Sequence, residues 1–104
     1  MSASVGHRYR IQVEEIDAPA RDAYLARAPL NFEFGNHDDI LAIVDRVRAG
    51  SAFPPHEATA LALGLKLFTG VMLRHRRDPL FADIQPALRA FIGNLKSRVA
   101  STTT

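Results

Sequence analysis

The apolar segment ATALALGLKLFTGVML, residues 58–73, constrains the fold more than any other part of the sequence. Its 16 residues fall short of the roughly 20 that a helix needs to span a bilayer, and Lys66 interrupts its middle. As a helix this segment is apolar on most of its circumference, so it has to be covered on several sides. We therefore predict a buried helix over residues 56–76, and no membrane span.

Two further helices are predicted on either side of this segment. The residues HDDILAIVDRVRAG begin with acids and end with arginines, and Gly50 is expected just past the last helical turn. A third helix begins near Pro86, which a helix tolerates only in its first turn, and ends near Val99. The apolar stripes of these two helices are Ile40, Ile43, Val44 and Val47, and Leu88, Phe91, Ile92, Leu95 and Val99.

The N-terminal part of the chain has the alternating pattern of β-strands. HRYRIQVEEI, residues 7–16, places Tyr9, Ile11 and Val13 on one face, and LNFEF, residues 30–34, repeats the alternation. The 13 connecting residues, 17–29, are too many for a tight turn and contain two prolines. We expect one helical turn there, around Tyr24 and Leu25.

This order of elements predicts an α+β fold, in which a two-stranded antiparallel β-hairpin with a long connection precedes three α-helices (ββααα). We expect a single domain over residues 1–104, with an ordered core over residues 7–99 and flexible termini at residues 1–6 and 100–104. Two strands alone are marginally stable in water. We therefore expect a homodimer, which could extend the sheet to four strands.

The composition excludes several kinds of chemistry. The chain has no cysteine, so disulfides, thiolate metal sites and cysteine nucleophiles are excluded. The N-terminus lacks the apolar stretch of a secretion signal, and we predict a cytoplasmic protein. The net charge of +2 is split, because residues 1–45 carry four arginines and eight acids, whereas residues 46–104 carry nine lysines and arginines and three acids. The acidic and basic halves could pack together within a chain or across a dimer.

The stretch NHDDI, residues 36–40, resembles a metal or acid–base site, but its spacing favours a helix start. Successive helical positions diverge by about 100°, so His37, Asp38 and Asp39 do not converge on one ion. We predict instead that Asn36 is the N-cap, with Asp38 and Asp39 in the first turn near the positive end of the helix dipole. The role of His37 stays open, and an enzyme or metal protein centred on His37 and Asp38 is retained as an alternative.

Basic residues mark two candidate interaction surfaces. The first is the cluster of Arg74, Arg76 and Arg77, which could contact phosphates and makes weak nucleic-acid binding or a regulatory role an alternative function. Cations at a helix C-terminus also complement the helix dipole without any ligand. The second surface is the outward face of the first strand, where Arg8 and Arg10 could meet a partner or guard the edge of the sheet. Alternatively, Arg10 could pair with Glu33 across the hairpin.

The phrases HRYRIQVE, FEFGNHDDILAIVDRVR and EATALALGLKLFTGVML together resemble a family of small bacterial proteins catalogued as a domain of unknown function. The resemblance covers residues 7–97 and implies a compact cytoplasmic protein, without an activity, cofactor or catalytic residue to carry over. The sequence itself contains no phosphate-binding glycine loop and no nucleophile elbow. We therefore predict a non-catalytic protein-interaction module, homodimeric, with an unidentified protein partner and no cofactor.

Overall fold

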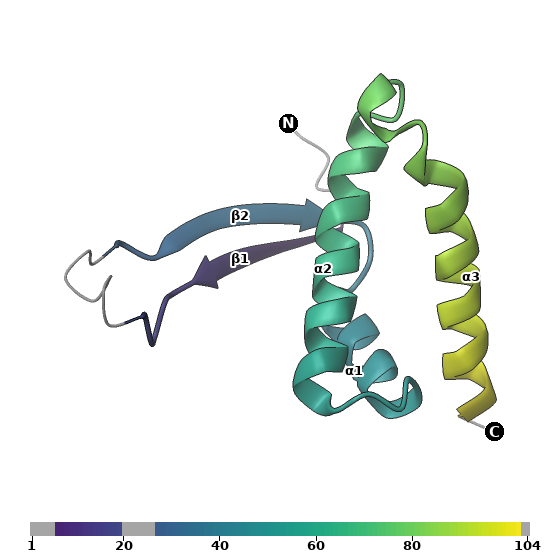
Figure 1. Cartoon of the computed structure of the whole chain (residues 1–104), viewed down its shortest axis with the longest axis horizontal. Coiled ribbons are helices and arrows are strands. Elements are labelled where there is room, and N and C mark those ends of the chain that lie inside the picture. Colours follow the sequence, from purple (N-terminus) through teal and green to yellow (C-terminus); the bar gives the residue numbers. More distant parts are fainter. Residues whose placement is uncertain (1–5, 20–26, 103–104) are drawn as a thin grey trace. The chain divides into compact units, whose positions relative to one another are not determined.

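The structure is a computed structural model of the chain, and it describes residues 6–19 and 27–102. It contains two compact units, Met1–His37 and Asp38–Thr104. Within these described residues, the element order is two strands followed by three α-helices, with a short 3-10 helix before the last of them (Figure 1). The predicted ββααα arrangement is therefore confirmed, whereas the helical turn predicted around Tyr24 and Leu25 lies outside the described residues.

The first unit holds the antiparallel strands β1 (His7–Val13) and β2 (Leu30–Asn36). Their register places apolar residues opposite one another, as the alternation predicted. Such cross-strand pairs are the stabilising unit of a sheet. Strand β2 is longer than the predicted residues 30–34, because its last residue still pairs with the start of β1. The apolar pairs are Tyr9 with Phe34, Ile11 with Phe32 and Val13 with Leu30.

Gly6 brings the chain into β1 through a backbone conformation that other residues rarely adopt. Its φ is +102°, and a Cβ atom added there would lie 2.6 Å from the carbonyl oxygen of Asn36 and 2.7 Å from the Cα of His37. Both neighbours are backbone atoms, which cannot move aside without displacing the strand. Only glycine therefore allows this close approach between the start of β1 and the end of β2.

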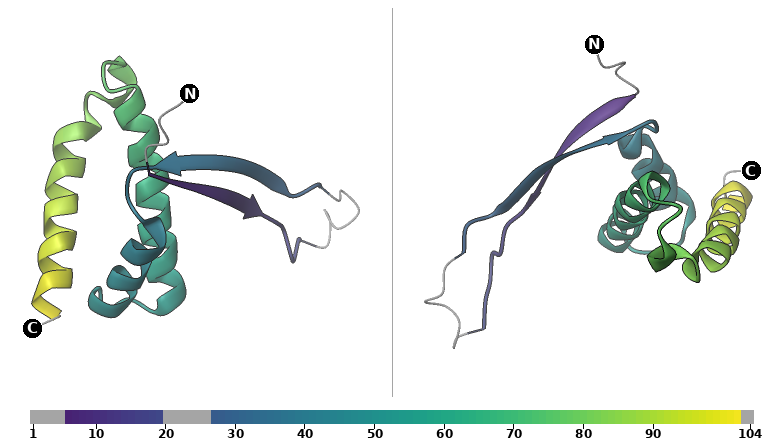
Figure 2. Two further views of the ribbon diagram at one scale, coloured as in Figure 1. Left: turned by 180° about the vertical axis from the view of Figure 1, so that it is seen from behind. Right: turned by 90° about the horizontal axis from the view of Figure 1, so that it is seen from above.

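The second unit holds α1 (Ile40–Gly50), α2 (Pro55–Arg74), the 3-10 helix η2 (Pro79–Phe81) and α3 (Ile84–Thr102). Helix α1 packs against both α2 and α3, while α2 and α3 are joined through η2 (Figures 1 and 2). Helix α3 continues past the predicted end at Val99, and Ser101 Oγ donates a hydrogen bond of 2.9 Å to the carbonyl oxygen of Ser97. Residues 100–102, expected to belong to a flexible tail, are therefore helical.

The core of the helical unit lies in two places. Along α1, the stripe residues Ile40, Val44 and Val47 are buried, and Ala58 and Ala62 on α2 are 0% and 1% exposed. Small alanine side chains allow the two helices to approach closely. The second cluster joins the C-terminal part of α2 to η2 and α3 and consists of Met72, Phe81 and Leu88, flanked by Leu65 and Ile92.

The end of α1 corrects the prediction for Gly50. This residue is the last residue of the helix, not the residue after it. The left-handed conformation that often ends a helix occurs two residues later, at Ala52, with a φ of 70°. Gly50 is needed for a different reason, since a Cβ atom there would lie 2.9 Å from the Cα of Val99 on α3. It marks the close crossing of α1 and α3.

Candidate functional site

The stretch NHDDI starts a helix, but not in the way that its sequence predicted. Asn36 pairs with His7 as the last residue of β2, so its backbone still belongs to the sheet and the N-cap prediction for it was wrong. Asp39 is the N-cap, with extended φ and ψ of −78° and 95°. Its carboxylate accepts a hydrogen bond of 3.1 Å from the backbone N–H of Ala42.

Asp38 also lies before the helix and not in its first turn. Its Oδ2 accepts a hydrogen bond of 2.7 Å from Nζ of Lys66. Lys66 is the one charged residue within the apolar segment of α2, and its side chain is only 21% exposed. The ion pair therefore gives this half-buried ammonium group a counter-charge, and it ties the start of α1 to the middle of α2.

His37 is exposed between β2 and α1. Within residues 6–19 and 27–102, no group of three or more histidine, aspartate or glutamate side chains is arranged to hold a metal ion. The two acids beside His37 have separate structural tasks, one as a helix cap and the other as the partner of Lys66. The stretch thus does not come together as one site.

The outward face of the hairpin carries a small ionic cluster. Glu33 pairs with Arg8 through Oε1 and with Arg10 through Oε2, the latter at 3.7 Å. Arg10 is directly opposite Glu33, whereas Arg8 is opposite Gly35 and reaches Glu33 diagonally. The sequence suggested only the Arg10 pair, although long side chains commonly span the diagonal. All three side chains are at least half exposed, so each pair contributes little stability.

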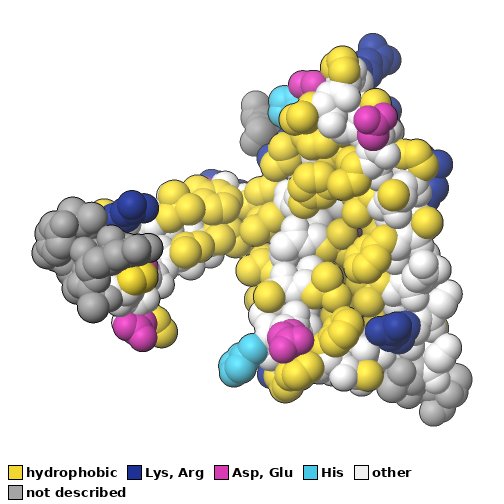
Figure 3. All heavy atoms as spheres, in the orientation of Figure 1, with side chains coloured by type: hydrophobic (Ala, Val, Ile, Leu, Met, Phe, Trp, Pro, Cys, Tyr) yellow, Lys and Arg dark blue, Asp and Glu magenta, His cyan; other side chains and the backbone are white. Residues whose placement is uncertain are grey.

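The other face of the hairpin is apolar and open. Val13, Leu30 and Phe32 are 57%, 59% and 40% exposed, although their alternation predicted half-buried strands. No third strand pairs with β1 or β2 in the described part of the chain. We call the exposed residues Val13, Leu30 and Phe32, together with the partly buried Ile11, the hairpin surface. Hydrophobic side chains along the strands are visible in Figure 3. Contiguous apolar patches of this kind mark interaction sites.

The basic cluster lies at the C-terminal end of α2. Arg74 is the last residue of the helix, and Arg76 and Arg77 follow in the turn that leads to η2. The turn is fixed by Asp78, which caps η2 by accepting a hydrogen bond of 2.9 Å from the N–H of Leu80. The cations therefore stand where they complement the dipole of α2.

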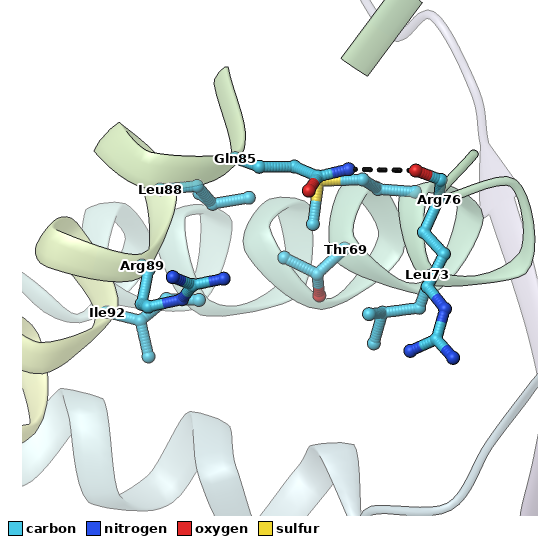
Figure 4. Close-up of a pocket in the computed structure, with 8 residues that line it drawn as sticks. Thr69, Leu73, Arg76, Gln85, Leu88, Arg89 and Ile92 are labelled. Carbon is cyan, nitrogen blue, oxygen red and sulfur yellow. Dashed lines mark hydrogen bonds between the residues drawn. The ribbon is translucent and has the colours of Figure 1, made fainter. Parts of the chain in front are cut away.

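Arg76 also belongs to a pocket between α2 and α3 that sequence patterns did not reveal. The pocket has a volume of about 310 Å³. Figure 4 shows Arg89 reaching it from α3 and Arg76 from the turn after α2. The only clue in the sequence is the short connection RDPLF, which keeps the two helix ends close. The pocket is lined by Thr69, Met72, Leu73, Arg76, Gln85, Leu88, Arg89 and Ile92.

Comparisons with known proteins indicate a family but no activity. Residues 7–97 match DUF3861, a domain of unknown function with a solved structure. The chain is also similar to a protein of unknown function from Pectobacterium atrosepticum, with a TM-score of 0.75 and 37% sequence identity over 88% of this chain and 98% of that protein. No curated protein matches the sequence. In the part of the chain that the structure describes, no helix is long and apolar enough to cross a membrane.

Proposed function

The chain belongs to DUF3861, a family of unknown function, and we propose that it is a small cytoplasmic, non-catalytic interaction module that forms a homodimer through strand β1. The observation that carries this proposal is the exposed hairpin surface, where Val13 and Leu30 are each more than half exposed. A two-stranded sheet is marginally stable alone, and cover for its edges and its apolar face would stabilise it. The absence of cysteine fits a reducing compartment.

Strand β1 has a sequence that is complementary to itself. Residues 7–15, HRYRIQVEE, comprise β1 and the two residues after it, and they are basic at the beginning and acidic at the end. When two copies run antiparallel with their Ile11 residues opposite each other, Arg8 of each copy faces Glu14 of the other. The same alignment places Tyr9 opposite Val13, so both apolar residues stay on one face. Opposite charges and apolar pairs across strands each favour association, and like charges never meet.

The proposed dimer has a four-stranded sheet with the order β2-β1-β1′-β2′. Its interface is isologous, which is the commonest arrangement in homodimers. Pairing of the two β1 strands removes two exposed edges and places the two hairpin surfaces side by side. The combined apolar face is the surface on which a further protein partner packs.

Sedimentation velocity of the full chain at micromolar concentration tests the dimer. We expect a species of twice the chain mass of 11.5 kDa. Arg8→Glu and Glu14→Arg should each weaken the dimer, because each creates two like-charge contacts. An equimolar mixture of the two variants should restore it, since each reversed residue then faces a residue of opposite charge.

Arg8→Glu also removes the pair with Glu33 inside the hairpin, so Glu33→Gln is the matched control. This change eliminates the intrachain pairs without altering the proposed interface, and the dimer should persist. An 11.5 kDa monomer for the unmodified chain would contradict the homodimer. A mixture that associates no better than the single variants would exclude the β1 pairing specifically.

A further inference from the structure

The pocket between α2 and α3 has the chemistry of a small-molecule site. Met72, Leu88 and Ile92 form its apolar part, and Met72 and Leu88 are each 9% exposed. Hydrophobic side chains gather over these two helices in Figure 3. Ligand sites typically combine an apolar lining with a few placed polar groups. The polar groups here are Thr69, Gln85 and two arginines.

The charge of the pocket has one sign. Among its eight lining residues are two cations, Arg76 and Arg89, and no acid. Within the described residues, neither guanidinium group has an ion-pair partner. Both arginine side chains are exposed, and a guanidinium group binds carboxylates with two parallel hydrogen bonds.

A hydrogen bond joins the two walls of the pocket. Gln85 Nε2 donates a hydrogen bond of 3.1 Å to the backbone oxygen of Arg76, which is the dashed line in Figure 4. This bond connects the first turn of α3 to the turn after α2. The hydrogen bond therefore keeps the backbone of Arg76 close to α3, the helix that carries Arg89.

We propose that this pocket binds a small monocarboxylate with an aliphatic body, such as a medium-chain fatty acid. The carboxylate lies between the guanidinium groups of Arg76 and Arg89, and the hydrocarbon lies against Met72, Leu88 and Ile92. The volume of about 310 Å³ lies at the lower end of the range of small-molecule pockets, which suits a ligand of this size. A polynucleotide fits less well, because the lining has no aromatic ring for stacking.

Isothermal titration of the full chain with decanoate, below its micelle-forming concentration, tests this site, with decanol as the neutral ligand of equal length. We expect saturable binding of one decanoate per chain and binding of decanol at least tenfold weaker. Arg76→Gln and Arg89→Gln should each weaken decanoate binding by about tenfold, since each removes one charge-assisted contact. Leu73→Ala should weaken both ligands equally, because Leu73 contributes only apolar lining.

Lys96→Gln is the matched control, because it removes one positive charge from α3 at a residue that does not line the pocket. It should bind decanoate as the unmodified chain does. Three results would overturn the proposal: no saturable binding, equal affinity for decanol, or full affinity in both arginine variants. If Leu73→Asp dissociated an oligomer and decanoate did not bind, the face would instead be buried between two copies. Binding of decanoate does not depend on pairing of β1, so this site and the proposed dimer are tested separately.

Discussion

At the scale of single residues, the start of α1 depends on Asp39. The first backbone N–H groups of a helix have no partner inside it, and the Asp39 carboxylate satisfies that of Ala42. The alternation in residues 30–34 did not show that β2 extends to Asn36 and moves the helix start to Ile40. The cap therefore lies three residues later than sequence preference alone predicted.

We expect Asp39→Ala to lower the free energy of unfolding by about 1 kcal/mol, the usual cost of losing an N-cap. Asp39→Asn keeps an oxygen that can accept the same hydrogen bond, so it should cost much less. Urea denaturation followed by circular dichroism measures both values. Equal losses in the two variants would show that the charge of Asp39, and not its capping bond, is what matters.

Replacing a glycine by alanine tests the close crossing of α1 and α3. Gly50→Ala places a Cβ atom 2.9 Å from the Cα of Val99, and we expect a loss of roughly 1–3 kcal/mol from overpacking. Gly64→Ala is the control, because nothing lies within 4 Å of an added Cβ there. It should gain about 0.5–1 kcal/mol from helix propensity. Thermal unfolding of the two variants should shift in opposite directions.

A substitution at Ala52 tests the left-handed backbone conformation that follows α1. Its φ of 70° is unfavourable for a residue with a Cβ atom. We expect Ala52→Gly to raise the free energy of unfolding by up to about 1 kcal/mol, measured by the urea midpoint. Ala49→Gly, at an exposed position inside α1, should instead lower it by a similar amount. A loss of stability in Ala52→Gly would contradict the left-handed conformation.

At the scale of elements, η2 connects the two long helices through a single side chain. Phe81 is 9% exposed and meets Phe68 of α2 edge to face, with ring centroids 6.0 Å apart. Its neighbour Leu80 is 77% exposed. The 3-10 helix therefore buries Phe81 in the cluster that joins α2 and α3 and leaves Leu80 exposed to solvent.

We expect Phe81→Ala to cost about 3 kcal/mol, because it leaves a cavity in the cluster. Leu80→Ala should change the free energy of unfolding by no more than about 0.5 kcal/mol. Chemical denaturation of both variants gives the comparison. Similar costs at the two positions would mean that Phe81 does not hold α2 and α3 together.

At the scale of the whole molecule, the proposed assembly is the pairing of two β1 strands. Dimerisation would stabilise the folded chain by mass action. We therefore expect the melting temperature of the unmodified chain to rise with protein concentration. This dependence should disappear in the Arg8→Glu variant when it is measured without Glu14→Arg. Differential scanning calorimetry at several concentrations measures it. A constant melting temperature, together with a monomeric mass, would contradict a dimer.

The order of the elements and the pairing of the strands follow from sequence alone. The alternation of Tyr9, Ile11 and Val13 specifies which side chains share a face of the hairpin, because side chains in strands alternate with a period of two. The stripe from Leu88 to Val99 specifies α3 through the helical period in the same way. These patterns are local, so they do not depend on which other elements lie nearby.

Packing between elements determined the features that the local patterns did not predict. The cap moved from Asn36 to Asp39 because strand pairing continued further along β2. Gly50 is required by its distance to α3, and not by its own backbone. Arg76 and Arg89 line one pocket although 13 positions separate them in the sequence. Each of these features joins residues that are distant along the chain, and a local period carries no information about such contacts.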